Sequence, residues 1–224
     1  MTYLLRVVLP DRPGSLGAVA SSLGAVGGDI LSLDVVERGP EGAVDDLLVE
    51  LPGGLADTLI TAAQSVDGVV VESLRPYVSG RDIHRDLELV DELAADSAAG
   101  LELLVAHAPG VFRAGWALLV GLDDGGRGRV LGRSPGAPDT DDLSFPWLPL
   151  MTARRMGSGA DDAWVPPRWG ALGMELAAAP VGSPAKAVLM GRPGGPRFRA
   201  SEVLRLAHLA GIAATVARPP ALAT

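Results

Sequence analysis

The 224-residue sequence contains no cysteine and no long apolar segment. Without cysteine, the chain forms no disulfide, thiolate metal site, cysteine nucleophile or thioether-linked cofactor, and its composition fits a reducing compartment. Charged residues appear as early as Arg6 and Asp11, and no apolar run approaches the ~20 residues that cross a bilayer. We therefore expect a cytoplasmic protein with no membrane partner.

Catalytic motifs and basic clusters are also scarce. The net charge of −8 opposes binding to the phosphates of a nucleic acid. His84, His107 and His208 do not lie at metal-ligand spacing, and neither a G-x-S-x-G turn nor a phosphate-binding glycine loop is present. Adjacent acids such as Asp45 and Asp46 point to opposite faces of a strand and form no acid–base pair. We expect a protein that is not an enzyme and has no cofactor or metal.

Hydrophobic residues make up 48% of the chain, enough to bury a core, and the length suits one large domain or two small ones. The first 77 residues contain six segments with their own periodicity and stop signals. Leu31, Leu33 and Val35, for example, are expected to share one face of a strand. The order is βαββαβ, which makes an antiparallel sheet with two helices on one face. The expected elements are strands at 2–9, 29–38, 43–51 and 68–77 and helices at 16–26 and 55–66.

The composition changes after a linker expected at 78–82, because all four tryptophans and all three phenylalanines follow it. A long helix is expected at roughly 83–107, a short helix at 148–157 and a last helix capped by Ser201. Strands are expected at 115–122, 175–180 and 185–192. The long helix carries a heptad-like stripe that either pairs with a second copy or covers its own sheet. The stripe consists of Leu87, Val90, Ala94, Ser97, Leu101, Leu104 and Ala108.

The stretch "DRPGSL" joins the first expected strand to the first expected helix. Pro13 fixes φ near the helical value, and Gly14 has no Cβ, so a ligand or another chain can approach its backbone closely. The first turn of a helix leaves up to about four N–H groups without partners and carries roughly half a positive charge, which suits a small carboxylate. The same residues also make an ordinary turn that binds nothing.

The segment "LPDRPGSLGAVASSLGAVGGDI" (9–30) resembles the ligand-binding signature of the ACT domain family. In that family a strand is followed by a D-R-P-G-x-L turn, a helix, a glycine-containing turn and a strand that opens with Asn-Ile. The resemblance implies regulation by a small molecule, most often an amino acid, bound where the first loop of one copy meets a strand of its neighbour. It implies that the ligand-binding residues of the loop are Asp11, Arg12, Pro13, Gly14, Ser15 and Leu16. The residues implied on the opposite side of the ligand site, called the opposite wall, are Gly28, Asp29 and Ile30.

Asp29 departs from this pattern, in which asparagine is usual. An asparagine amide both donates and accepts hydrogen bonds, whereas an ionised aspartate only accepts them. Asp29 would therefore repel a ligand carboxylate and favour an ammonium group. Either the ligand is turned around, or its identity differs, or this copy no longer binds. Capping or turn formation is the structural alternative for Asp29.

The segment 172–217 is similar to the C-terminal part of the GAF domain family, with Pro180, Phe198 and the helix start at Ser201 and Glu202 in the matching places. GAF-like modules hold small ligands in a cup between the sheet and its loops, or serve only for dimerisation. Large aromatic side chains either line such a cup or fill a core. Those designated as lining a second-domain pocket are Trp116, Phe145, Trp147, Trp164 and Trp169.

The expected fold class is α+β: a ferredoxin-like βαββαβ ACT domain at 1–77, then a GAF-like α/β domain at 83–218 with an antiparallel sheet flanked by helices. The segment 219–224 is a tail. The expected function is a non-enzymatic sensor that binds an amino acid, forms a homodimer and signals to an unidentified protein partner. The alternatives are a structural dimerisation module without a ligand and an enzyme that uses the tryptophan-lined pocket.

Overall fold

The structure is a computed structural model that describes residues 1–40, 42–77, 85–96, 98–140, 143–157 and 163–217. The chain divides into two compact units, Met1–Ile83 and His84–Thr224. The linker expected at 78–82 and the tail expected at 219–224 lie outside the described residues. The predicted mixed class, with antiparallel sheets flanked by helices, is confirmed. The assignment of the first unit to the ACT family stays a prediction.

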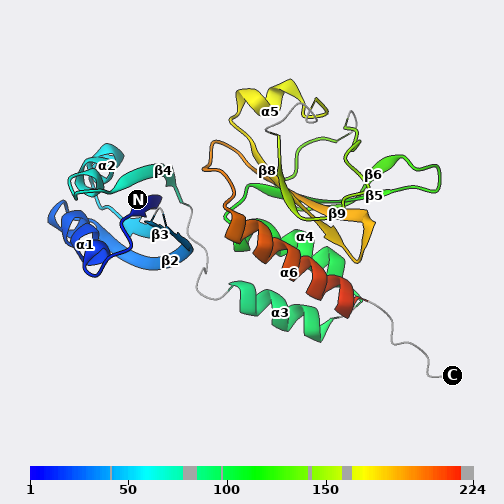
Figure 1. The fold of residues 1–224 in the computed structure, drawn as a ribbon, viewed down its shortest axis with the longest axis horizontal. Coiled ribbons are helices and arrows are strands. Elements are labelled where there is room, and N and C mark those ends of the chain that lie inside the picture. The colour runs from blue at the N-terminus through cyan, green and yellow to red at the C-terminus, as the bar shows by residue number, and fades with distance from the viewer. Residues whose placement is uncertain (41, 78–84, 97, 141–142, 158–162, 218–224) are drawn as a thin grey trace. The chain divides into compact units, whose positions relative to one another are not determined.

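The first unit is a four-stranded antiparallel sheet whose strand order is β2-β3-β1-β4. Two helices cover one face of this sheet (Figure 1). Alternate residues of β1 enter the core with the apolar positions of both helices, as the sequence periodicity requires. In chain order the elements are β1 (Thr2–Leu9), α1 (Ser15–Ala25), β2 (Asp29–Gly39), β3 (Gly42–Glu50), α2 (Ala56–Gln64) and β4 (Val70–Pro76).

The C-terminal end of α1 is fixed against β3 through Gly28. The amide of Gly28 donates to the carbonyl oxygen of Leu23 at 3.0 Å. A Cβ at Gly28 would lie 3.1 Å from Val49 Cγ1 and 3.2 Å from Leu59 Cδ2, closer than most side chains tolerate. Glycine therefore lets the turn after α1 pack tightly on the core.

The edge strand β2 corrects one sequence prediction. Its register against β3 shifts between Ile30 and Ser32, which marks a bulge. As a result Leu33 packs on the core while Leu31 remains 45% exposed. The expected common face is wrong for Leu31, because the extra residue at the bulge changes the face of that side chain. Leu33 and Val35 pair with Leu47 and Asp45 and do share a face, on which Val35 is 48% exposed.

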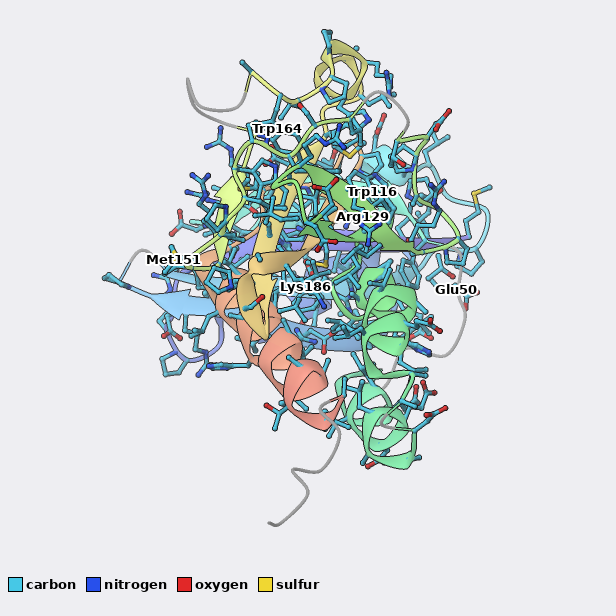
Figure 2. The ribbon with its side chains drawn as sticks, turned by 90° about the vertical axis from the view of Figure 1, so that its right-hand side faces the viewer. Glu50, Trp116, Arg129, Met151, Trp164 and Lys186 are labelled. Carbon is cyan, nitrogen blue, oxygen red and sulfur yellow. The ribbon has the colours of Figure 1, made fainter. Side chains whose placement is uncertain are left out.

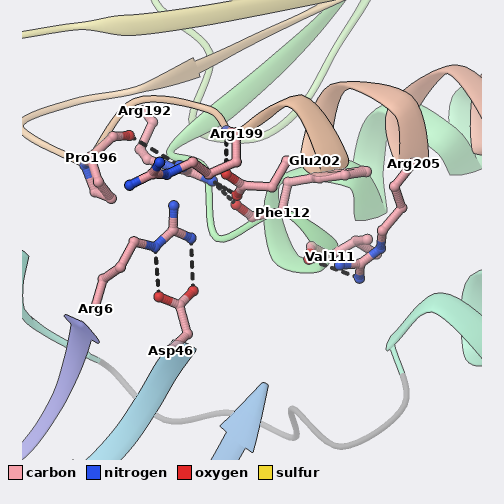
Figure 3. Close-up of polar contacts among 9 residues, drawn as sticks. All are labelled: Arg6, Asp46, Val111, Phe112, Arg192, Pro196, Arg199, Glu202 and Arg205. Carbon is pink, nitrogen blue, oxygen red and sulfur yellow. Dashed lines mark hydrogen bonds and ion pairs between the residues drawn. The ribbon is translucent and has the colours of Figure 1, made fainter. Parts of the chain in front are cut away.

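A cross-strand ion pair joins β1 to β3. Arg6 Nε and Nη2 lie 2.7 and 2.8 Å from the two carboxylate oxygens of Asp46 (Figure 3). This bidentate geometry is the strong form of an arginine–carboxylate contact. Since Arg6 and Asp46 are direct partners in the ladder, the pair specifies the register of the two central strands.

The second unit is built on a five-stranded antiparallel sheet with the order β6-β5-β9-β8-β7. The helices α4 and α6 lie on one side of this sheet and the short helix α5 on the other (Figure 1). Its elements are α3 (Arg85–Ala95), α4 (Gly100–Val111), β5 (Trp116–Leu122), β6 (Gly128–Arg133), β7 (Arg154–Met156), α5 (Pro167–Ala171), β8 (Glu175–Val181), β9 (Ser183–Arg192) and α6 (Ala200–Val216).

Both faces of this sheet are buried, and each supports a separate apolar cluster. Ala117 and Leu119 of β5 face the cluster made with α3, α4 and α6. Trp116, Leu118 and Val120 face the aromatic cluster on the other side. The strand therefore reads as a continuous apolar run, since both sets of alternating residues are buried.

The single long helix expected at 83–107 is wrong. Two helices, α3 and α4, lie there instead, and the backbone between them turns where the Asp96 carboxylate accepts the N–H of Ala99 at 3.2 Å. Leu89 and Leu93 of α3 and Leu104 of α4 pack in the core of the same unit. Of the described stripe residues, Leu104 and Ala108 are buried in this core and Val90 and Leu101 pack against it, whereas Ala94 is exposed.

Two further local predictions are wrong. The last helix begins at Ala200, and Ser201 lies inside its first turn instead of capping it. The Glu202 carboxylate accepts the N–H of Arg199 at 2.8 Å and closes that helix start. The expected short helix at 148–157 is replaced by the strand β7, which pairs with β8.

Arg192 ties the end of β9 to two helices. Its guanidinium donates to the carbonyl oxygens of Pro196 and Phe112 at 3.0 and 2.6 Å and to Glu202 Oε1 at 2.6 Å (Figure 3). The guanidinium carbon also lies 4.0 Å from the centre of the Phe198 ring. A fully buried charge is tolerated because carboxylate, carbonyl oxygens and ring face surround it.

Gly191 is expected to be required for packing of the second unit. A Cβ at this position would overlap the ring of Trp116, which is buried and cannot move away freely. Gly191→Ala should lower the free energy of unfolding by about 1–3 kcal/mol, measured by urea denaturation. Gly211→Ala, on an open face of α6, is the control and should raise it by about 0.5–1 kcal/mol. An unchanged Gly191→Ala protein would contradict this packing.

Candidate functional site

The N-terminus of α1 has no side-chain cap. Gly14 occupies the N-cap position with φ 92°, a conformation that favours glycine, and a Cβ there would meet no atom within 4 Å. The amide of Ser15 donates to the carbonyl oxygen of Arg12 at 3.2 Å. Within the described residues, the amides of Leu16 and Gly17 have no hydrogen-bond partner. Two donors at the positive end of the helix dipole are therefore available to an anion.

Two buried polar side chains accompany these amides. The hydroxyl of Ser15 and the Oδ1 atom of Asp45 are inaccessible to solvent and have no hydrogen-bond partner in the described part of the chain. Asp45 is 3% exposed and Ser15 8%. An unpaired buried polar group costs about 1–3 kcal/mol, and more when it is charged. Buried polar atoms of this kind are uncommon in folded proteins, so each requires an explanation.

The fold brings these two side chains to the same end of the unit. β1 ends at Leu9, which pairs with Ala43 at the start of β3, and the chain then enters α1 at Ser15. From Leu23 back to Ser15 the helix rises about 12 Å. From Val49 back to Asp45 the strand runs about 13 Å. Because Leu23 and Val49 meet at Gly28, Ser15 and Asp45 both belong to the opposite end of the first unit.

Asp45 lies on the helix-covered face of the sheet. It shares the strand phase of Ala43, Leu47 and Val49, all of which belong to the apolar core. Its direct cross-strand partner is Val7 of β1, also a core residue. The carboxylate therefore points into an apolar interior and not into solvent.

Burial raises the pKa of the Asp45 carboxyl above its ordinary value of 3.8. The positive charge of Arg38 lowers it, and the negative charges of Asp46 and Asp11 raise it further. Asp11 belongs to the D-R-P-G loop and Arg38 to the end of β2, so both lie within electrostatic reach of Asp45. Loop, strand end and buried acid form one polar region.

Most of the predicted loop residues lie on the surface of the unit at this end. Asp11, Arg12, Pro13 and Leu16 are exposed, and Arg12 Nη2 lies 3.6 Å from a carboxylate oxygen of Asp67. Exposed ion pairs of this length contribute little stability, so Arg12 is free to move to a ligand at small cost.

The predicted opposite wall lies far from the loop in one copy of the chain. Asp29 pairs with Glu50 at the end of β3, whereas the loop follows Leu9, which pairs with Ala43. Seven residue steps along β3 separate those two ends, a distance of about 23 Å. The structure therefore does not bring Gly28, Asp29 and Ile30 to the D-R-P-G loop within one protomer.

Sequence reasoning missed Asp45, which was set aside as one of an adjacent acidic pair. A signal was present: in "AVDDLLVEL" the apolar phase through Ala43, Leu47 and Val49 is interrupted by Asp45 alone. A carboxylate at a core position requires a partner or a function.

The five aromatic side chains designated for a second-domain pocket pack on one another. The ring centres of Trp116 and Trp169 are 5.0 Å apart, those of Trp147 and Trp164 5.7 Å, and those of Phe145 and Trp147 5.9 Å. All five are at most 9% exposed. Figure 2 shows Trp116 and Trp164 on the side of the sheet away from α4 and α6. This packing favours the interpretation that they fill a core.

Neither a metal-binding cluster nor a membrane-spanning helix is found among the described residues. No group of three or more histidine or acidic side chains there is arranged to hold a metal ion. The helices of that part of the chain are too short or too polar to cross a bilayer.

Comparison with known proteins gives structural neighbours only. No family model matches the chain, and no curated protein matches it. A methyl-accepting chemotaxis protein fragment (residues 122 to 287) is 11% identical, with a TM-score of 0.42 over 58% of this chain and 94% of its own. The GAF domain of PixJ from Thermosynechococcus elongatus is 17% identical, with a TM-score of 0.41 over 55% and 85%.

A third neighbour spans nearly the whole chain. The chromophore-binding domain of the bacteriophytochrome RpBphP3 from R. palustris is 14% identical, with a TM-score of 0.42 over 96% of this chain and 92% of its own. Similarity at this level assigns the chain to no family.

Asp45→Asn is expected to stabilise the protein at pH 7 by about 1 kcal/mol, since it removes a buried charge that lacks a partner. The raised pKa means that the folded state binds the proton more tightly than the unfolded state. The stability that comes from this tighter proton binding is fully present below pH 3.8, the ordinary pKa of the carboxyl. It is lost as the pH rises through the raised pKa of the folded state. The advantage of Asp45→Asn should therefore grow from about pH 4 to pH 7 in urea denaturation. An Asp45→Asn protein that is less stable at pH 7 would show that the carboxylate has a stabilising partner.

Proposed function

We propose that this chain is a non-enzymatic regulatory protein of the cytoplasm that binds an amino acid at an interface between two copies of its first unit. The observation that carries the proposal is the uncapped start of α1, where the amides of Leu16 and Gly17 await an acceptor beside a glycine with open space. A carboxylate is the small ligand group that suits such a helix end. The sequence resemblance to the ACT family supports the same site.

Two copies are needed because the two predicted walls lie at opposite ends of one protomer. β2 is an edge strand. If two β2 strands pair antiparallel about a twofold axis, the start of one strand lies beside the end of the other. Gly28, Asp29 and Ile30 of one copy then approach the D-R-P-G loop of the second. The exposed apolar side chains of Leu31 and Val35 on this edge would be covered by such pairing.

The second unit, in this proposal, is a GAF-like module that receives the signal. Its sheet is covered on both faces, and its aromatic cluster fills the side where a ligand cup was expected. Ligand binding is therefore assigned to the first unit. Closure of the first-unit dimer around an amino acid would shift the placement of the second units and so alter binding to a protein partner.

A thermal-shift screen of the twenty proteinogenic amino acids tests the proposal. A ligand at a hundredfold excess over its Kd adds ~2.7 kcal/mol of stability and should raise Tm by several degrees. A dimer that responds to none of the twenty would instead indicate a structural interaction module, and turnover of a metabolite would indicate an enzyme.

A variant pair on α1 locates the response. Gly17 and Gly24 are both exposed, and a side chain at either meets no atom within 4 Å. Gly17→Glu places a carboxylate at the free amides, where it competes with a ligand carboxylate, and should abolish the Tm shift. Gly24→Glu carries the same charge at the other end of α1 and should retain the shift. Equal responses from the two variants would place the ligand elsewhere.

A further inference from the structure

The strongest unexplained feature of the first unit is the pair of buried polar groups below the start of α1. The Asp45 carboxylate and the Ser15 hydroxyl lie at the same end of the α1–β3 interface, and each lacks a hydrogen-bond partner among the described residues. They do not bond to each other, although a hydroxyl can donate to a carboxylate. A third group that donates to both would satisfy them.

We propose that Asp45 and Ser15 form the subsite that receives the ammonium group of the ligand, so that only molecules with an ammonium group beside a carboxylate bind. This inference rests on the proposed function and names the residues that determine its specificity. An ammonium group has three donors, Asp45 supplies a charged acceptor, and Ser15 supplies a second acceptor. The ligand carboxylate goes to the amides of Leu16 and Gly17, the two residues that follow Ser15 in the chain.

Electrostatics in this region favour the same orientation. The negative charges of Asp11 and Asp46 raise the pKa of Asp45 and the positive charge of Arg38 lowers it, while Asp46 is itself paired with Arg6. A plain carboxylic acid would bring a negative charge to this group without compensating it. An α-amino acid brings a positive charge to Asp45 and a negative charge to the helix end, so each charge meets its complement.

The site should discriminate strongly between an amino acid and its desamino analogue, because the analogue leaves a buried acceptor unpaired. A site built to bind an N–H group rejects an analogue that lacks it, because the acceptor then stays desolvated and without a partner. Asp45 is 97% buried, since its exposed fraction is 3%. Its carboxylate therefore cannot turn to water when a desamino ligand binds.

The test uses isothermal titration of the full chain with each amino acid that raises the wild-type Tm and with its desamino carboxylate. Wild type should bind the amino acid at least about tenfold more tightly than the desamino analogue. Asp45→Asn should weaken amino-acid binding about tenfold or more and should not weaken the binding of the analogue. Ser15→Ala should weaken amino-acid binding less. Asp57→Asn, on the exposed surface of α2, removes the same charge and should bind as wild type.

A second measurement applies to wild type and needs no variant. An ammonium group beside Asp45 lowers the pKa of that carboxyl, so binding of the amino acid at mildly acidic pH should release protons. Titration in two buffers with different ionisation enthalpies detects this release, and a purely structural Asp45 would give none.

The outcomes separate the two proposals. If the amino acid binds wild type and Asp45→Asn equally well, the ammonium subsite is wrong and the amino-acid site survives. The same holds if binding releases no protons or if the desamino analogue binds wild type as tightly. If no amino acid binds wild type, both the proposed function and this subsite are wrong.

Discussion

The direction of α1 relative to β3 is the constraint on which the candidate site depends. The helix follows β1 back along the sheet, and Gly28 fixes its last turn to the Val49 end of β3. The uncapped first turn must then lie over the opposite end, where Asp45 interrupts the apolar face. The same geometry moves Asp29 to the far end of the sheet. The direction of α1 therefore places the D-R-P-G loop and the unpaired polar groups at one end of the sheet. It places Gly28, Asp29 and Ile30 at the other end.

These unpaired polar groups lower the stability of the fold, which is expected where residues are selected for binding. A protein selected only for stability would place an apolar residue at position 45 and a capping side chain in place of Gly14. In the second unit the charge of the buried Arg192 is compensated, because its terminal nitrogens donate to the Glu202 carboxylate and to two carbonyl oxygens. Buried polar groups without partners, in a region reached by the charges of a loop, are typical of a binding site.

Much of the first unit could be predicted from sequence because each element has its own apolar period and its own glycine or proline boundary. The bulge at Leu31 could not, since one extra residue in a strand leaves no local signal and reverses the side-chain phase. The break at Asp96 was missed for a similar reason: an aspartate side chain that accepts a backbone N–H resembles an ordinary helix surface residue.

The loop half of the site was also predictable, because the turn chemistry of Pro13 and Gly14 carries its own physical meaning. Asp45 was missed because its significance depends on the register of β3 against α1, which no single stretch of sequence contains. Its position in an apolar phase was the available signal. The distance between the two walls, about 23 Å in one protomer, likewise follows from strand pairing and not from the motif.

The claim that two copies complete the site is tested most directly by complementation between two defective chains. Gly17→Glu blocks the loop, and Asp29→Trp fills the opposite wall at an exposed strand start. Neither protein alone should bind an amino acid that stabilises wild type. Refolded together, they form mixed dimers with one intact site, and roughly a quarter of the wild-type number of sites should return. Mixed dimers that recover no binding, or an Asp29→Trp protein that binds normally, would contradict a site shared between two copies.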